Sequence, residues 1–190
     1  MTTTNDRADE TLRVARARYW EANGFGDDGG ESKTWEIVKI GPIPIPIRNI
    51  EARKSAIRYH DLHHVVTGYD TSFAGEAEIS AWELRTGCAD QWVAWLLGFQ
   101  ILLFGLWSPR RMLRAWTRGG HTQSLYTEDF NDALLDSTVG EVRQRLGLDQ
   151  AIASPTLFDR MSLIFWTLAS VVGQAGALGA AVYALIWLVS

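Results

Sequence analysis

The last 30 residues constrain this chain most, because no side chain from Met161 to Ser190 carries a charge. A helix of that length would be about 45 Å long, and the hydrocarbon core of a bilayer is roughly 30 Å thick. Trp166 and Trp187 lie near the two ends of the segment, as in the aromatic belts of spanning helices. A buried core helix is the alternative, but so long an uncharged run disfavours it. The sequence therefore predicts a membrane anchor over residues 161–190, with the rest of the chain facing the cytoplasm.

A second uncharged run extends from Gln91 to Pro109. A helix from Gln91 to Trp107 would be about 25 Å long, a little short of the hydrocarbon core. If it spanned the bilayer, it would place basic residues on both sides, which the cytoplasmic preference of Lys and Arg disfavours. We therefore expect this helix to lie in or dip into the membrane interface, or to form the wall of an apolar pocket.

Before the anchor, the sequence predicts one all-α domain over residues 12–150, preceded by a disordered terminus at 1–11. Two stretches are not helical in pattern: residues 34–40 alternate as in a short strand or extended arm, and the alternating prolines of 41–47 fix a stiff extended spacer. The expected helices cover residues 12–23, 49–67, 72–85 and 129–136, with a short one opened by the capping box Thr138–Glu141 and closed by Gly147.

Charge and cysteine content exclude two classes of protein. The chain has 18 basic and 22 acidic residues, a net charge of -4, and no basic block large enough to follow nucleic-acid phosphates. The single cysteine, Cys88, excludes an internal disulfide.

Three of the four histidines lie within five positions, at His60, His63 and His64. On a helix, residues 60 and 64 project from one face about one turn apart, and Asp61 lies on its flank. Residues 68–71 form a predicted turn, so a second, antiparallel helix would bring Glu76 back alongside the histidines. Two imidazoles and one or two carboxylates form a mixed ligand set for a divalent metal ion, with zinc favoured and iron, manganese or magnesium as alternatives. A surface or core histidine pair is the simpler interpretation, although such clustering is unusual.

Several neighbouring side chains could support such a site. His63 points away from the face of His60 and His64, so we expect it to be exposed to solvent or to support the ligands. Glu78 and Glu83 are spare carboxylates on the second helix, and Tyr59, His63 or Glu83 could transfer protons.

Two better-known histidine patterns fit less well. The spacing of His60, His63 and His64 matches one box of the membrane desaturases, but those di-iron sites need about eight histidines and this chain has four. The pair His60-Asp61 also occurs in metal-dependent phosphohydrolases, which need a further histidine upstream, and none precedes His60 here. The number of histidines excludes the desaturase pattern, and the lack of an upstream histidine weakens the phosphohydrolase interpretation.

The run His60-Asp61-x-x-His64, followed by eleven residues and then Glu76, resembles the signature of the coenzyme Q biosynthesis protein 4 family. The phrase Tyr19-Trp20-Glu21-Ala22-Asn23-Gly24 and the extended Pro/Ile arm before the first motif helix are also similar. The likeness covers about residues 12–148. The hydrophobic tail from Met161 and a shorter amino-terminal part depart from the family pattern, and they leave room for another prenyl lipid as substrate.

The resemblance implies an all-helical, often dimeric protein that holds a divalent cation beside an apolar groove. The metal ligands and catalytic residues would be His60, Asp61, His64 and Glu76. The implied work is on the polyprenylated benzoate precursor of ubiquinone, by oxidative removal of the ring carboxylate with hydroxylation at that carbon. The implied partners are the membrane and other quinone biosynthesis enzymes. The alternative function is a non-catalytic scaffold that binds a prenyl lipid and organises those enzymes.

Overall fold

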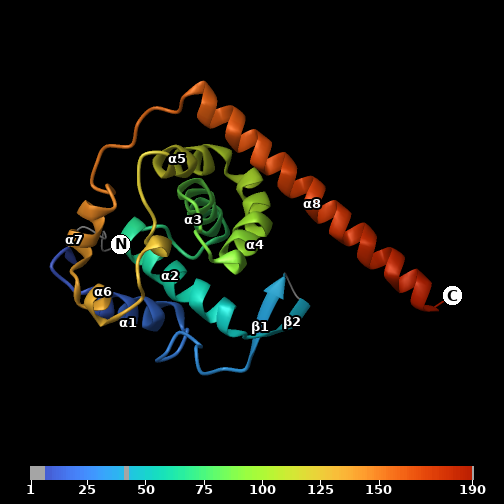
Figure 1. Cartoon of the computed structure of the whole chain (residues 1–190), viewed down its shortest axis with the longest axis horizontal. Helices are drawn as coiled ribbons and strands as arrows, with labels where there is room; N and C mark the ends of the chain where they lie inside the picture. The colour runs from blue at the N-terminus through green and yellow to red at the C-terminus, as the bar shows by residue number, and fades with distance from the viewer. Residues whose placement is uncertain (1–6, 41–42, 190) are drawn as a thin grey trace.

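The protein is mostly helical, and its structure, a computed structural model, describes residues 7–40 and 43–189 (Figure 1). The elements in chain order are α1 (Leu12–Asn23), β1 (Trp35–Ile40), β2 (Ile43–Arg48), α2 (Glu51–Thr67), α3 (Phe73–Thr86), α4 (Trp92–Ile101), the 3₁₀ segment η2 (Leu102–Trp107), α5 (Pro109–Gly119), the 3₁₀ turn η3 (Leu125–Thr127), α6 (Asp132–Asp136), α7 (Val139–Arg145) and α8 (Leu157–Val189).

The helix α3 lies at the centre of the domain, with α2, α4 and α5 around it (Figure 1). Ala77, Ile79, Ala81 and Trp82 are fully buried, and Glu78 and Glu83 are buried with them. Buried carboxylates need partners, so these two glutamates are expected to pair with groups on neighbouring elements. In Figure 1, α3 is seen nearly end-on while α2 lies across the view, so the two motif helices cross rather than form the expected antiparallel pair.

The amino-terminal segment is attached to the domain from residue 7 onward. Thr11 pairs with Thr138 in an isolated β-bridge, and the Glu10 carbonyl accepts a hydrogen bond from the Val139 N–H at 2.8 Å. The expected disorder therefore does not extend over residues 7–11, because their backbone groups bond to the start of α7. The rest of that prediction, residues 1–6, lies outside the described residues.

The strands β1 and β2 pair in an antiparallel sheet, so the domain is not purely α-helical. Trp35 pairs with Arg48, and Ile37 pairs with Pro46. Prolines are tolerated here because each strand of a two-stranded sheet is an edge strand, and alternate residues direct their N–H groups to the same side. The extended conformation is thus confirmed over residues 35–40 and 43–47, and residues 41–42 of the predicted spacer lie outside the described residues.

The predicted apolar helix at 91–107 consists of α4 followed directly by η2, and it lies against α8. The rings of Trp95 and Trp166 stack at 6.1 Å between centroids. The buried Ser170 hydroxyl donates a hydrogen bond to the Phe99 carbonyl at 2.5 Å, and the Gln174 amide donates to the Gln100 carbonyl at 3.3 Å. These carbonyls end α4, where the helix itself offers no further N–H donors. Ser170 and Gln174 therefore attach α8 to α4.

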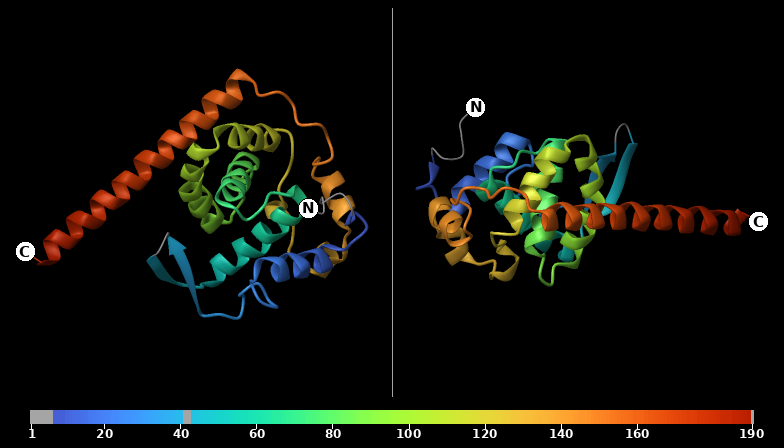
Figure 2. Two further views of the ribbon diagram at one scale, coloured as in Figure 1. Left: turned by 180° about the vertical axis from the view of Figure 1, so that it is seen from behind. Right: turned by 90° about the horizontal axis from the view of Figure 1, so that it is seen from above.

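The helix α8 is long and apolar enough to cross a membrane, as the sequence predicts. It begins at Leu157, four residues before the predicted start, where the Asp159 carboxylate accepts hydrogen bonds from the Thr156 N–H and hydroxyl. Its first half lies along α5 and α4, and its second half projects away from the domain (Figure 2). Nearly all described side chains of that projecting half are exposed.

Candidate metal centre

His60, His64 and Glu76 converge from α2 and α3, and each offers one ligand atom within 4.8 Å of the others. The Nε2 atoms of His60 and His64 are 3.2 Å apart. Glu76 Oε2 lies 3.4 Å from Nε2 of His60, and Oε1 lies 3.4 Å from Nε2 of His64. Three of the four predicted ligand residues are therefore brought together at one point.

The turn between α2 and α3 places Glu76 opposite the histidines. Gly68 ends α2 in the left-handed conformation, at φ 77°, and Ser72 caps α3 by accepting a hydrogen bond from the Gly75 N–H. A Cβ atom on Gly75 would lie 2.0 Å from the Asp70 carbonyl oxygen. Only glycine allows the chain to pass so closely there, and Glu76 is the next residue.

Both histidines are oriented through their second ring nitrogen. Nδ1 of His64 lies 2.9 Å from the Tyr69 carbonyl oxygen, and Nδ1 of His60 lies 3.0 Å from Glu83 Oε1. Because a carbonyl and an ionised carboxylate only accept hydrogen bonds, each Nδ1 carries a proton and donates it. In the neutral imidazoles the Nε2 lone pairs then face each other and Glu76. Metal-binding histidines are held in this way by a carboxylate or carbonyl behind them.

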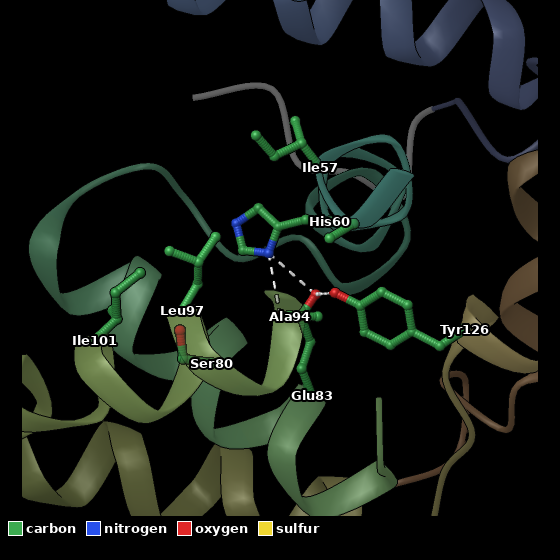
Figure 3. A pocket seen from close by; sticks show the side chains of 10 residues that line it. Ile57, His60, Ser80, Glu83, Ala94, Leu97, Ile101 and Tyr126 are labelled. Atoms are coloured by element: carbon green, nitrogen blue, oxygen red, sulfur yellow. Dashed lines mark hydrogen bonds and ion pairs between the residues drawn. The ribbon is translucent and has the colours of Figure 1, made fainter. Parts of the chain in front are cut away.

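Glu83 is the centre of a buried hydrogen-bond network behind His60 (Figure 3). Its Oε1 atom accepts from Nδ1 of His63 at 2.7 Å and from the Tyr126 hydroxyl at 2.9 Å, in addition to His60. Nε2 of His63 accepts from the Leu125 N–H at 2.9 Å, so His63 is neutral with its proton on Nδ1. Of the two alternatives for His63, solvent exposure is wrong because the side chain is fully buried. It contacts Glu83, which in turn accepts a hydrogen bond from His60.

The ionisation of these groups follows from their contacts. Burial alone would lower the pKa of His60, but the charges and hydrogen bonds of Glu83 and Glu76 outweigh it and raise that pKa well above 6.5. Burial would raise the pKa of Glu76, yet its bonds to His60 and His64 lower it to about 2. Burial likewise opposes ionisation of Glu83, and the charge of His60 together with the hydrogen bonds from His60 and His63 lowers its pKa. The site therefore presents two carboxylates to one pair of imidazoles, and this excess of negative charge suits a cation.

The spacing of the histidine and carboxylate atoms suits a small divalent ion. Ligands about 2.0–2.1 Å from a tetrahedral zinc ion are separated by roughly 3.3 Å from one another. Here the two Nε2 atoms are 3.2 Å apart, and each lies 3.4 Å from a different oxygen of the Glu76 carboxylate. Two imidazole lone pairs facing each other this closely repel unless a proton or a cation lies between them. Two histidines and one carboxylate are the protein ligands of many catalytic zinc sites, which keep a further position open.

Asp61, the fourth predicted ligand, lies outside this group of ligand atoms. Its Oδ2 atom accepts a hydrogen bond from the Trp20 indole N–H at 2.7 Å, which joins α1 to α2. Burial raises the pKa of Asp61. Tyr59 is also directed elsewhere, because its hydroxyl donates to the Glu128 carbonyl at 2.7 Å. Glu78, a spare carboxylate in the sequence, pairs with Arg111 at 2.5 Å.

A cavity of about 390 Å³ opens beside the ligand atoms. Its polar lining includes His60, Asp61 and Glu76, and its apolar lining includes Leu97 and Ile101 of α4. The ring of Tyr19, another lining residue, stacks on the His64 ring at 5.3 Å between centroids. A ligand in this cavity would contact two of the three candidate metal ligands, His60 and Glu76, and the aliphatic side chains of Leu97 and Ile101.

We expect zinc affinity to rise with pH from 6 to 8. In the metal-free protein the His60 imidazole favours its protonated form, since the charges and hydrogen bonds of Glu83 and Glu76 raise its pKa well above 6.5. A metal ion must displace that proton, so binding weakens as the pH falls and releases protons as it proceeds. Titration calorimetry in buffers of different ionisation enthalpy measures both effects. A zinc affinity that does not change over this range would contradict this picture of the site.

Comparisons of the chain with family models, with curated proteins and with solved structures found no match.

Proposed function

We propose that this protein is a membrane-anchored, divalent-metal-dependent enzyme of ubiquinone biosynthesis that acts on the ring of a polyprenylated benzoate. The observation that carries the proposal is the convergence of His60, His64 and Glu76 on one point beside a cavity with an aliphatic wall. These are residues of the family-like motif found in the sequence. The spacing of these three side chains and the orientation of both imidazoles support the proposal that the motif binds a cation.

The apolar surface around the cavity supports a lipid substrate. Leu97 and Ile101 line the cavity from α4, and the outer side of the same helix exposes Trp92 and Leu96. The helix α8 lies against α4, so a hydrocarbon chain could follow α4 from the bilayer to the ligand atoms. In this arrangement α8 anchors the protein, and the metal domain lies on the cytoplasmic face of the membrane.

In the proposed reaction the ligand residues and their neighbours would have different roles. His60, His64 and Glu76 would hold the ion, which as a Lewis acid would polarise the ring hydroxyl or carboxylate. Asp61 lines the same cavity with a raised pKa, so its carboxyl group is the one we expect to exchange a proton with a bound ring. Glu83 would hold the orientation of His60 and remain ionised.

The proposed conversion is an oxidation and needs an electron acceptor. Replacing a ring carboxylic acid by a hydroxyl consumes one water and yields carbon dioxide, two protons and two electrons. A divalent zinc ion accepts none of these electrons, so with zinc an external two-electron oxidant must take part. With iron or manganese, the metal itself could relay electrons to that oxidant.

The variant Glu76→Gln tests the proposal. It keeps the shape of the side chain and removes the negative ligand, so we expect quinone output to fall by about tenfold or more and the carboxylated precursor to accumulate. Cells that produce only the variant are analysed by mass spectrometry of their lipid extract. His121→Gln, in an exposed loop, is the matched control. Normal quinone levels in cells with Glu76→Gln would exclude the enzymatic function.

A prenyl-lipid-binding scaffold is the second candidate, and a separate apolar cavity favours it. This cavity, of about 460 Å³, is lined by Phe73, Phe104 and Trp107 and by two small residues, Ala74 and Ser108, and it has no ionisable lining group. Such a surface suits lipid binding without chemistry. A scaffold of this kind, acting as a monomer or a homodimer, would retain its partner enzymes and most quinone output in the Glu76→Gln variant.

A further inference from the structure

A second polar cavity is bordered by the turn that joins α2 to α3. Its volume is about 290 Å³, and three arginines of α5 line it, namely Arg111, Arg114 and Arg118. Tyr69 contributes from the turn, and Asp70 and Glu78 are its acidic lining residues. Neither the metal-binding residues nor the family-like motif includes any of the three arginines.

Both acidic lining residues form ion pairs with the same arginine. Arg111 pairs with Glu78 at 2.5 Å and with Asp70 at 3.6 Å. The Arg114 guanidinium forms neither a hydrogen bond nor an ion pair with any described residue. Two of the three cations in this cavity are thus left without a carboxylate partner in the described part of the chain.

Of Arg114 and Arg118, the two arginines without a carboxylate partner, Arg118 is the buried one. Its side chain donates to the backbone carbonyls of Thr67 and Leu148, both at 3.1 Å, and only 9% of the residue is exposed. Its Nε atom is buried and has no partner among the described residues. The Tyr69 hydroxyl is also buried and donates its proton to no described residue, and the Arg118 guanidinium lies beside it, 5.7 Å from the centre of the Tyr69 ring. Unpaired buried donors are costly, so such a group in a native cavity requires an explanation.

We propose that this cavity binds a phosphate group, held by Arg114, Arg118 and the Tyr69 hydroxyl. A phosphate offers several acceptor oxygens, which match guanidinium donors and a hydroxyl arriving from different elements. It would also compensate the buried charge of Arg118. The phosphate could belong to a soluble ion or to an anionic lipid head group, since α5 packs against the start of α8. This site does not depend on the metal centre or on the proposed function.

Two variants test the site without removing the residues that hold the fold. Tyr69→Phe deletes only a hydroxyl that donates its proton to no described residue, and it keeps the Tyr69 carbonyl that orients His64. Arg114→Gln removes an exposed guanidinium without a described partner. The matched control is Arg110→Gln, which removes the same charge from the same helix at an exposed position outside the cavity lining.

Binding of inorganic phosphate is measured by calorimetry on the full chain in phosphatidylcholine nanodiscs, with EDTA present to remove metal. We expect saturable binding that each of Tyr69→Phe and Arg114→Gln weakens by about tenfold or more, with Arg110→Gln unchanged. Nanodiscs containing phosphatidic acid show whether the bound phosphate group belongs to a lipid head group or to a soluble ion. If they abolish binding of inorganic phosphate, the head group occupies the cavity, and if they do not, the ligand is soluble phosphate.

Two results would overturn the proposal. One is the absence of saturable phosphate binding together with equal affinity of the wild type and both variants for phosphatidic acid vesicles. The other is an equal loss of binding in Arg110→Gln, which would show that net charge alone attracts the anion.

Discussion

The His64→Ala variant is expected to bind zinc more than about a hundredfold more weakly than the wild-type protein. Loss of a residue that only supports a metal ligand typically costs 10–100-fold in affinity, and removal of a ligand itself costs more. His64 supplies one of three protein ligand atoms, so its loss leaves only His60 and Glu76. Competition with a chelating indicator measures the affinity, and metal analysis of the purified protein identifies the ion.

Two further variants distinguish ligand loss from general damage. Glu83→Gln keeps a hydrogen-bond acceptor for His60 and removes the charge behind it, so zinc affinity should fall by an intermediate factor of about 10–100. His121→Ala removes an exposed histidine and should have no effect. Circular dichroism verifies that each variant is folded. Equal zinc affinity in His64→Ala and the wild type would show that the three ligand atoms do not form the site.

Local signals in the sequence were sufficient for most helices and for the positions of the principal ligands. Thr138 and Glu141 form the predicted capping box, and Gly68 ends α2 as expected for a glycine at a helix terminus. The pairing of His60 and His64 follows from helical periodicity alone. The start of α8 was missed because the prediction followed the absence of charge, whereas Thr156 and Asp159 begin the helix through local hydrogen bonds.

The surroundings of the site depend on contacts between distant residues, which no local pattern encodes. Tyr126 reaches Glu83 from a 3₁₀ turn 43 positions away, and Trp20 reaches Asp61 from 41 positions away. Helical periodicity places Glu76 and Glu83, seven positions apart, on one face of α3. It gave no means of deciding which carboxylate faces the lone pairs and which lies behind the ring of His60. That choice depends on how α3 crosses α2.

The Gly75→Ala variant is expected to destabilise the protein and weaken metal binding together. Replacing glycine by alanine inside a helix usually stabilises it by about 1 kcal/mol. Here the new Cβ atom would lie 2.0 Å from the Asp70 carbonyl oxygen and 2.2 Å from Asp70 Oδ1. The backbone must therefore shift, and overpacking of this kind lowers the free energy of unfolding by about 1–3 kcal/mol or more. Because the displaced segment leads directly into Glu76, zinc affinity should fall as well.

The control for this prediction is Gly176→Ala in α8, where the same added Cβ atom meets nothing within 4 Å. That variant should be as stable as the wild type or slightly more stable, since only the helical preference changes. Thermal unfolding in detergent, with and without zinc, measures both variants. Zinc should raise the unfolding temperature of the wild type and of Gly176→Ala by similar amounts, and that of Gly75→Ala much less, because ligand-linked stabilisation depends on affinity. A Gly75→Ala protein with normal stability and a normal response to zinc would mean that the close turn does not position Glu76.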